Sequence, residues 1–376
     1  MLRFWIVLAV LLSGTLSAQE VPIPAQPKLD AKSYILLDFD SGRVLAKDNP
    51  DERLPPASLT KLMTSYVVFK ALKNGQIHLD DKVYISKKAW RTQGSKMFIE
   101  VGTRVPVDEL LQGMIVQSGN DASVALAEHV AGSEDSFVDL MNQYAKALGM
   151  KNTHYHDATG LPTKDHYSSA RDTAILSRAI IAEFPKYYRY YSEKVFTYNS
   201  IKQHNRNSLL WRDDSVDGLK TGHTEAAGYC LASSAERSDM RLVAVVMGTP
   251  SADARVNESQ SLLNYGFRFF ETHRLYAHGK PVTKARVWKG EPEQVPLGLD
   301  EDLYVTIPRG HYNALKANMD LPQQIVAPLG KDVKVGEVHV SFNGKAVSTE
   351  PLVSLQAVPE AGLWTRLKDQ VMLWLH

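Results

Sequence analysis

The chain has 376 residues, of which 44% are hydrophobic and 23% are charged. This composition is typical of globular proteins and excludes a collagen-like, low-complexity or mainly disordered chain. Lysine and arginine together number 43, and aspartate and glutamate number 42, so no overall basic field predicts a nucleic-acid partner. The single cysteine, Cys230, excludes an intramolecular disulfide and a cysteine-rich zinc site.

The N-terminus combines a short basic segment with an apolar run. Arg3 precedes the run 4–12, and small residues follow up to Ala18. This pattern is typical of a secretory signal peptide over residues 1–18, because the run is shorter than the roughly 20 apolar residues that span a bilayer. A buried N-terminal helix is the alternative. We expect an exported protein whose mature chain carries balanced charge.

The next part of the chain mixes helical and strand-like patterns. Two strand-like runs, 33–37 and 43–46, flank an Asp-Ser-Gly turn and indicate a hairpin. Periodicity then predicts several helices, a later pair of strands and a closing helix. In chain order these are helices at 58–73, 107–115, 122–130 and 173–184, strands at 228–233 and 241–247, and a helix at 258–270.

The pattern changes after Tyr276. Helical periodicity stops, and short β-like runs recur at about ten-residue spacing, as in small antiparallel β domains. We therefore place a domain boundary at 276–280, between a mixed domain over 29–276 and an all-β domain over 280–360. The predicted strands of the second domain lie at 283–288, 303–307, 324–327, 337–342 and 352–358.

The last residues, 362–376, predict an amphipathic helix that follows a break at Gly362. Its apolar side chains share one face, and charged side chains lie off that face. The segment is too short and too charged to span a bilayer, but its two tryptophans suit a membrane interface. A terminal helix packed against the protein body is the alternative. The apolar face comprises Trp364, Leu367, Val371, Trp374 and Leu375.

Ser58-Leu59-Thr60-Lys61 opens the first long predicted helix. Residues at i and i+3 share a helix face, which puts the Lys61 amine beside the Ser58 hydroxyl. Serine needs a base to act as a nucleophile, and a partly buried lysine near another cation can have its pKa lowered enough to serve. The positive end of the helix dipole suits a developing oxyanion. Alone, a pattern this short also arises by chance.

Two further tripeptides follow in order. Ser118-Gly119-Asn120 lies in a turn between predicted helices, where its serine can relay a proton and its asparagine can hold a substrate amide. Lys220-Thr221-Gly222 ends a strand-like segment and offers a second cation, a hydroxyl for a carboxylate and room for a substrate backbone. Taken singly they indicate a capping turn and an exposed strand end. All three motifs in this order rarely arise by chance.

With these motifs the chain resembles the penicillin-recognising serine enzymes, whose signature is S-x-x-K, S-x-N and K-T-G. The neighbouring residues narrow the resemblance to D-alanyl-D-alanine carboxypeptidases of the type 5 and 6 penicillin-binding proteins. The resemblance covers essentially the whole mature chain. The segments that carry it, besides the S-x-x-K motif, are 118–122, 168–172, 205–207 and 220–224.

The resemblance implies an α+β fold. Its catalytic domain, over 29–276, is β-lactamase/transpeptidase-like, with an antiparallel sheet flanked by helices. A small all-β domain over 280–360 and an amphipathic membrane-anchoring helix over 362–376 follow. The implied location is the periplasm, with peripheral attachment to the inner membrane through this helix. No cofactor or metal is expected, because the H-x-H pair at 154–156 lacks a spaced third ligand.

The resemblance also implies a role for each catalytic residue. Ser58 attacks the carbonyl of the penultimate D-alanine and forms an acyl-enzyme, while Lys61 takes the serine proton. Ser118 and Lys220 pass a proton to the departing D-alanine. Asn120 orients the acylated peptide.

The remaining implied roles concern substrate binding. Backbone N–H groups of Ser58 and His223 form the oxyanion hole. Thr221 and Arg255 bind the terminal carboxylate, which explains why a free C-terminus is the substrate. Arg206 is expected to support the site from nearby. The implied substrate-binding residues are Lys220, Thr221, Gly222 and Arg255.

The implied function is removal of the terminal D-alanine from peptidoglycan pentapeptides, with β-lactam antibiotics as covalent inhibitors. No E-x-x-x-N motif lies between Asp121 and Lys220, which disfavours a class A β-lactamase and predicts a persistent penicilloyl-enzyme. Two alternatives stay open. One is a D,D-endopeptidase or transpeptidase on the same fold, and the other is a catalytically silent wall-binding protein, against which the intact motifs argue.

Overall fold

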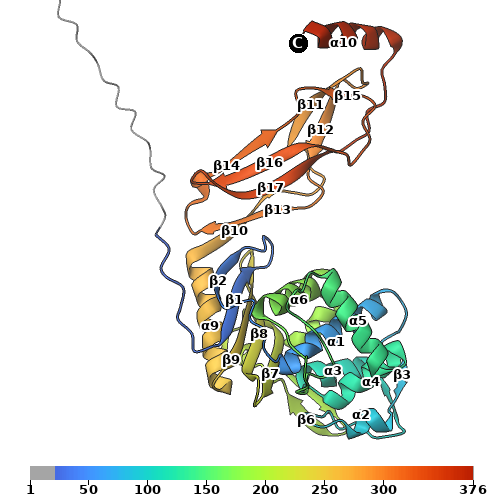
Figure 1. Ribbon diagram of the computed structural model, residues 1–376, viewed down its shortest axis with the longest axis vertical. Helices are drawn as coiled ribbons and strands as arrows, with labels where there is room; N and C mark the ends of the chain where they lie inside the picture. Colours follow the sequence, from blue (N-terminus) through green and yellow to red (C-terminus); the bar gives the residue numbers. More distant parts are fainter. Residues whose placement is uncertain (1–21, 376) are drawn as a thin grey trace, which may run out of the picture. The chain divides into compact units, whose positions relative to one another are not determined.

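The structure is a computed structural model that describes residues 22–375 (Figure 1). The expected signal peptide over residues 1–18 lies outside the described residues. The chain divides into a unit formed by Ala25–His273 and a unit that includes Arg274–His376. Each unit has its own hydrophobic core.

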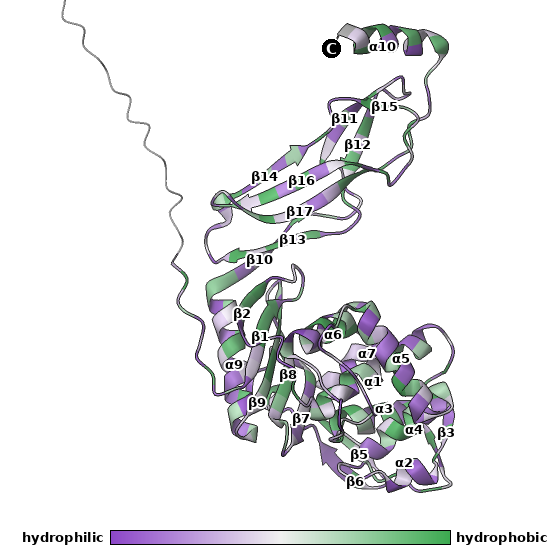
Figure 2. Ribbon diagram, viewed as in Figure 1, coloured by the Kyte–Doolittle hydropathy of each residue, from purple (hydrophilic) through white to green (hydrophobic). Residues whose placement is uncertain are grey.

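The unit formed by Ala25–His273 is built on an antiparallel sheet with the strand order β2-β1-β9-β8-β7. β9 is buried on both faces, and it accordingly reads as an almost continuous apolar run. Figure 2 shows β9 coloured mainly as hydrophobic. The strands are β1 (Ser33–Asp38), β2 (Val44–Asp48), β7 (Val216–Thr224), β8 (Gly228–Arg237) and β9 (Met240–Thr249).

Helices cover both faces of this sheet (Figure 1). α9 packs against β8 and β9 on one face, and α6 with the other helices fills the opposite side around the buried helix α1. The helices are η1 (Ala57–Thr60), α1 (Lys61–Lys73), α2 (Lys87–Arg91), α3 (Val107–Val116), α4 (Asn120–Ala131), α5 (Glu134–Ala147), α6 (Ala170–Glu183), α7 (Pro185–Tyr188), η2 (Arg189–Ser192), α8 (Leu209–Arg212) and α9 (Ala252–Phe269). Two small antiparallel two-stranded sheets pair β3 (Lys82–Tyr84) with β4 (Arg104–Pro106) and β5 (Val195–Tyr198) with β6 (Ile201–His204).

The closing helix of this unit begins earlier than its periodicity indicated. We expected a helix over 258–270, whereas α9 begins at Ala252. The Ser251 side chain accepts a hydrogen bond from the backbone N–H of Ala254 and caps the helix there. This earlier start puts Arg255 in the first turn of α9.

The helix expected over 58–73 also begins differently. Its first residues form the 3-10 turn η1, and α1 begins at Lys61. β7 passes so close to this turn that a Cβ atom on Gly222 would lie 3.0 Å from the Pro56 carbonyl oxygen and 3.3 Å from the Leu59 nitrogen. Glycine therefore permits the close approach that brings Ser58 beside β7.

The unit that includes Arg274–His376 contains a second sheet, with the strand order β14-β16-β17-β12-β11-β15. Neighbouring strands are antiparallel except for β11 and β15, which are parallel. The strands are β11 (Thr283–Trp288), β12 (Gln294–Gly298), β14 (Leu315–Asp320), β15 (Ile325–Val326), β16 (Lys334–Phe342) and β17 (Lys345–Ser354). β10 (Phe270–Tyr276) enters this unit at Arg274 and pairs with β13 (Leu303–Pro308), and η3 (Tyr312–Ala314) precedes β14.

The last helix, α10 (Leu363–Leu375), attaches to this sheet through its polar side. The buried Asp369 carboxylate accepts a hydrogen bond from the Lys289 backbone N–H at 2.6 Å, and the Arg286 guanidinium lies 3.4 Å away. The apolar face points outward, with Trp364 and Trp374 each 86% exposed. The α+β fold expected from the sequence, with an all-β domain and a terminal amphipathic helix, is confirmed.

Candidate active site

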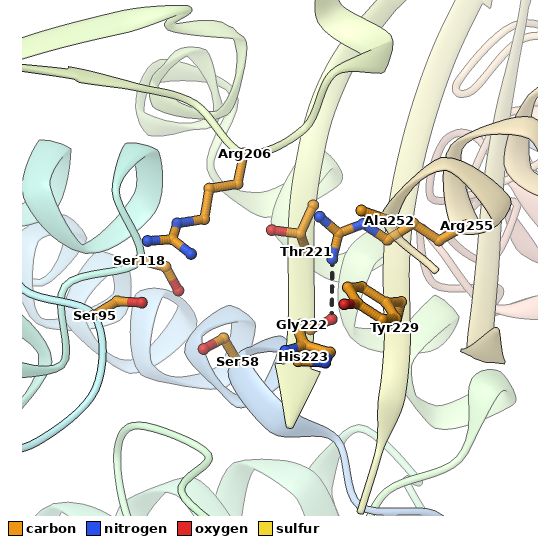
Figure 3. Close-up of a pocket in the computed structure, with 10 residues that line it drawn as sticks. All are labelled: Ser58, Ser95, Ser118, Arg206, Thr221, Gly222, His223, Tyr229, Ala252 and Arg255. Carbon is orange, nitrogen blue, oxygen red and sulfur yellow. Dashed lines mark hydrogen bonds between the residues drawn. The ribbon is translucent and has the colours of Figure 1, made fainter. Parts of the chain in front are cut away.

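A polar pocket of about 470 Å³ opens where η1, the start of α4 and β7 meet. Figure 3 shows Ser58 at its floor, Ser118 and Arg206 on one wall, and β7 with Arg255 on the other. The lining residues are Ser58, Ser95, Ser118, Arg206, Thr221, Gly222, His223, Tyr229, Ala252 and Arg255. The catalytic and binding residues selected from the sequence line this pocket, except for three that are buried behind it. Those three are Lys61, Asn120 and Lys220.

The amine of Lys61 contacts Ser58. Its Nζ atom lies 3.0 Å from Ser58 Oγ, 2.6 Å from Asn120 Oδ1 and 2.6 Å from the Thr159 carbonyl oxygen. Neither of the last two oxygens can donate a hydrogen bond. A neutral amine therefore gives its two N–H groups to Asn120 and Thr159, and its lone pair faces the Ser58 hydroxyl.

Burial makes Lys61 a base near neutral pH. Desolvation of the buried amine lowers the pKa of Lys61 to about 7, with Arg206 adding to the shift and Asp157 and Asp121 opposing it. A lysine with this pKa is substantially neutral at physiological pH, so it can accept the proton of a serine hydroxyl.

Ser118 is held in an uncommon conformation at the pocket wall. It has a φ of +67°, in the left-handed region that few non-glycine residues adopt. Its buried Oγ has no hydrogen-bond partner among the residues that the structure describes. Strain and an unsatisfied hydroxyl at a pocket are typical of functional residues.

The segment before the S-x-N motif is tied to it by hydrogen bonds. The Asn120 Nδ2 donates to the Gln93 carbonyl at 2.7 Å, and the Asn120 backbone N–H donates to the Ser95 carbonyl at 2.7 Å. Asp121 accepts backbone N–H bonds from Met97 and Phe98 at 3.0 Å. These bonds place the Ser95 side chain at the pocket.

The third motif lies on β7 at the edge of the sheet. Lys220 is buried, and its Nζ donates to the Thr221 carbonyl at 3.2 Å. Desolvation, together with the positive charges of Lys61, Arg206 and Arg255, brings the pKa of Lys220 well below its usual range. Thr221 and His223 line the pocket on the same strand.

Arg255 reaches the pocket from the first turn of α9. Its Nη1 donates to the Gly222 carbonyl at 3.1 Å, and its guanidinium lies 5.5 Å from the ring centre of Tyr229. The Tyr229 ring in turn stacks on the His223 ring, with 4.0 Å between the ring centres. Figure 3 shows these three side chains together on one wall.

Arg206 extends from the loop between β6 and α8 toward Ser118 (Figure 3). Its two neighbours anchor the loop: Asn205 Nδ2 donates to the Glu193 carbonyl at 2.9 Å, and Asn207 Nδ2 donates to the Gly218 carbonyl at 3.1 Å. The Asn205-Arg206-Asn207 segment therefore holds its arginine over the pocket through buried amides.

Sequence reasoning missed two polar residues that line the pocket, Ser95 and Tyr229. Ser95 lies in a loop without a motif, and only its hydrogen bond to Asn120 reveals it. Tyr229 pairs with His223 across β7 and β8. The predicted pair of strands contained Tyr229, and extending that pairing to the K-T-G segment would have identified it.

A metal site was not expected from the sequence. Across residues 22–375, no group of three or more His, Cys, Asp or Glu side chains has the geometry to hold a metal ion. The buried Nδ1 of His166 lies 3.2 Å from the Asp157 carboxylate, and its Nε2 lies 2.9 Å from Thr60 Oγ1.

Comparisons with known proteins identify the family of the chain. Residues 20–251 match the D-alanyl-D-alanine carboxypeptidase family, and residues 270–360 match the penicillin-binding protein 5 C-terminal domain. The chain is 47% identical to the D-alanyl-D-alanine carboxypeptidase DacA of Escherichia coli, over 94% of this chain and 90% of that protein.

Solved structures show the same likeness. Penicillin-binding protein 5 from Haemophilus influenzae superposes with a TM-score of 0.86 at 46% identity, over 90% of this chain and 100% of that one. Penicillin-binding protein D2 from Listeria monocytogenes, in its ampicillin-bound form, superposes with a TM-score of 0.60 at 30% identity, over 65% of this chain and 100% of that one.

The fold and the serine–lysine pair define a serine peptidase of the penicillin-recognising class. More narrowly, the chain belongs to the D-alanyl-D-alanine carboxypeptidase family. The family resemblance and the class of enzyme expected from three short motifs are thereby confirmed.

Proposed function

We propose that the protein removes the terminal D-alanine from peptidoglycan pentapeptides through an acyl-enzyme on Ser58. The observation that carries this proposal is the Lys61 amine, 3.0 Å from Ser58 Oγ, with Asn120 Oδ1 and the Thr159 carbonyl oxygen each 2.6 Å from its nitrogen. This arrangement directs the lone pair of a neutral amine at the serine hydroxyl. A serine at a polar pocket with such a base is a nucleophile.

Acylation begins when Lys61 accepts the Ser58 proton as Ser58 Oγ attacks the carbonyl carbon of the penultimate D-alanine. The carbonyl oxygen becomes an oxyanion, which the backbone N–H groups of Ser58 and His223 stabilise. The peptide C–N bond then breaks, and the leaving nitrogen gains the proton that Lys61 had taken, passed through Ser118 and Lys220, so that Lys61 is neutral again. The acyl chain remains on Ser58, and Asn120 orients it.

Water completes the reaction. It attacks the ester carbonyl and transfers a proton to Lys61, which returns that proton to Ser58 Oγ as the ester bond breaks. The tetrapeptide leaves as a carboxylic acid, which loses its proton to solvent. The charges at the pocket support a substrate with a free C-terminus: Arg206 and Arg255 line it, and no carboxylate is among the described lining residues. Thr221 and Arg255 bind the terminal carboxylate on the side of β7, where Lys220 and Gly222 complete the substrate-binding segment.

The same serine is the proposed site of covalent inhibition by β-lactam antibiotics. Penicillin-binding protein D2, with a similar fold, is known in an ampicillin-bound form. A β-lactam carries a strained amide and a carboxylate, so it can acylate Ser58 while its carboxylate meets Thr221 and Arg255. We expect the penicilloyl-enzyme to persist, because no carboxylate among the described lining residues assists Lys61 in activating the deacylating water.

We further propose that the protein is periplasmic and lies on the inner membrane through α10. Within residues 22–375, no helix has both the length and the apolar character required to cross a bilayer. The outward face of α10 instead carries exposed Leu363, Leu367 and Val371 in addition to the two exposed tryptophans. Burying one such leucine or valine contributes about 1.5–3 kcal/mol, so this face favours an interfacial position.

The reaction is tested by measuring D-alanine release from a muropeptide pentapeptide. The wild-type protein should release one D-alanine for each pentapeptide, and Ser58→Ala should release none. Labelled penicillin provides the matching test of the nucleophile, because a tryptic peptide that contains Ser58 should carry the label. Absence of both signals in the folded wild-type protein would favour a silent wall-binding protein.

A further inference from the structure

A buried network of polar residues lies behind Lys61, on the side away from the pocket. Thr60 Oγ1 lies 2.9 Å from Nε2 of His166, and Nδ1 of His166 lies 3.2 Å from Oδ2 of Asp157. The side chains of His166 and Asp157 are 2% and 17% exposed. None of these three residues lines the pocket.

The other oxygen of the Asp157 carboxylate organises the loop that contacts Lys61. Oδ1 accepts the backbone N–H and the hydroxyl of Thr159 at 2.7 and 2.6 Å, and the backbone N–H of Gly160 at 2.7 Å. The carbonyl oxygen of the same Thr159 accepts the hydrogen bond from Lys61 Nζ at 2.6 Å. A single carboxylate thus fixes the peptide unit that contains this carbonyl and the peptide unit before it.

The hydrogen-bonding partners of His166 set its role. Asp157 Oδ2 can only accept, so Nδ1 of His166 donates to it, while Nε2 faces the Thr60 hydroxyl. The His156 backbone N–H is a more distant neighbour of Nδ1, at 3.4 Å. Thr60 directly precedes Lys61 in the chain. The Asp157–His166–Thr60 network therefore contacts both the loop that contains Thr159 and the turn η1 that leads into α1.

Burial opposes ionisation of Asp157, but hydrogen bonds from His166 and Thr159 outweigh it and hold the pKa of Asp157 below its usual range. The carboxylate is therefore negative throughout the neutral pH range. Its charge favours the ammonium form of Lys61. Asp121 acts on the pKa of Lys61 in the same direction, and Arg206 acts in the opposite one.

We propose that Asp157 is a positioning residue for the Lys61 base, acting through the Thr159 carbonyl and braced by His166 and Thr60. This inference rests on the proposed function, since it assigns a support to the base of that reaction. The carboxylate determines where the carbonyl lies, and the carbonyl determines which way the amine points. The negative charge also keeps the base from losing its proton too readily.

The test is the second-order rate of acylation by a fluorescent penicillin, measured over a pH series that brackets neutrality. Asp157→Asn keeps the shape of the side chain but removes its charge and one acceptor from the network. We expect the plateau rate to fall roughly 10- to 100-fold, the loss associated with a misplaced catalytic group. The midpoint of the acidic limb should move to lower pH, because a charge that favours the protonated amine is gone.

His166→Gln separates the two effects. It leaves the Asp157 charge in place but removes the imidazole brace, so the plateau should fall while the midpoint moves less than in Asp157→Asn. Thr60→Ser keeps the hydroxyl and should stay close to wild type. This pattern is not expected from a general loss of stability, which would lower the active fraction at every pH.

Glu134→Gln is the matched control. Glu134 Oε1 accepts the Ala158 backbone N–H at 3.1 Å, so this carboxylate holds the same loop without touching Thr159 or His166. It should leave plateau and midpoint near their wild-type values. An Asp157→Asn protein with unchanged plateau and midpoint would overturn the inference, as would an equal loss in Glu134→Gln. If Asp157→Asn does not fold, the plateau rate of His166→Gln is the test. A lower plateau supports the inference, and a wild-type plateau overturns it.

Failure of this inference can be distinguished from failure of the proposed function. Acylation of the wild-type protein by penicillin tests the proposed function. The ratio of variant to wild-type rates tests the role of Asp157 alone.

Discussion

The amine nitrogen of Lys61 lies 3.0 Å from the hydroxyl oxygen of Ser58, three residues earlier in the chain. Because burial lowers the pKa of Lys61 to about 7, its neutral form appears as pH rises through neutrality. The acylation rate should therefore increase with pH along a limb with a midpoint near 7, measured with a fluorescent penicillin. A rate that stays flat from acid to neutral pH would show that Lys61 is not the base.

Removing the Lys61 amine should abolish most of this rate. Lys61→Met keeps a similar apolar length but cannot accept the Ser58 proton, and the loss of general-base catalysis is about 10²–10⁴-fold. The acidic limb with its midpoint near 7 should disappear together with the rate. The measurement is the same penicillin acylation, with circular dichroism to confirm that the variant is folded.

Gly160 has a φ of +85°, and a Cβ atom there would lie 1.8 Å from the Ala57 carbonyl oxygen. Gly160→Ala should therefore distort the turn before Ser58, lower the melting temperature and suppress acylation.

Gly149→Ala is the matched control, because Gly149 has a φ of +75° and a Cβ atom there would have no neighbouring atom within 4 Å. The alanine at this position bears the free-energy cost of a left-handed backbone conformation, about 1–2 kcal/mol, but meets no steric clash. It should lose stability but keep the wild-type acylation rate per folded molecule. Equal acylation by both variants would contradict the account.

Arg255 is predicted to recognise the terminal carboxylate of the substrate. A hydrogen bond to a charged group contributes about 1.5–3 kcal/mol, so Arg255→Gln should lower kcat/KM for a pentapeptide roughly 10- to 150-fold. A pentapeptide with an amidated C-terminus supplies the control. The wild-type protein should process it poorly, and Arg255→Gln should change that low rate little. A similar loss on both peptides would instead indicate a structural role.

The apolar face of α10 should hold the protein on membranes. Replacing Trp364 and Trp374 with serine removes the two most exposed aromatic side chains of this helix, and should reduce sedimentation with anionic lipid vesicles. Asp369→Asn is the comparison, because it weakens the contact with Lys289 without changing the apolar face. That variant should still sediment, and persistent binding of the double tryptophan variant would exclude α10 as the anchor.

Some of the site could be predicted because its geometry is local. The three-residue spacing of Ser58 and Lys61 was enough to place a hydroxyl beside an amine, even though Ser58 lies in a 3-10 turn and not in the helix expected there. The S-x-N and K-T-G motifs, which follow S-x-x-K in a fixed order, identified Ser118 and the Thr221–Gly222 segment of the pocket.

Other contacts join segments that are distant in sequence, so no local pattern reveals them. Thr60 and His166 are 106 positions apart yet lie 2.9 Å from each other. The Thr159 carbonyl that orients Lys61 belongs to a residue with no motif, because a backbone oxygen is present at every position. The first turn of α9 was missed for a different reason: its cap, Ser251, precedes a polar stretch that masks the helical periodicity.

The most direct test of the central claim is the mass of the product formed from a muropeptide pentapeptide in ¹⁸O-labelled water. The account predicts a tetrapeptide that has lost one alanine and carries one ¹⁸O in its new carboxylate, formed by the wild-type protein and not by Ser58→Ala. A cross-linked dimer without ¹⁸O would make the protein a transpeptidase. Labelled tetrapeptide formed equally by Ser58→Ala would contradict the acyl-enzyme on Ser58.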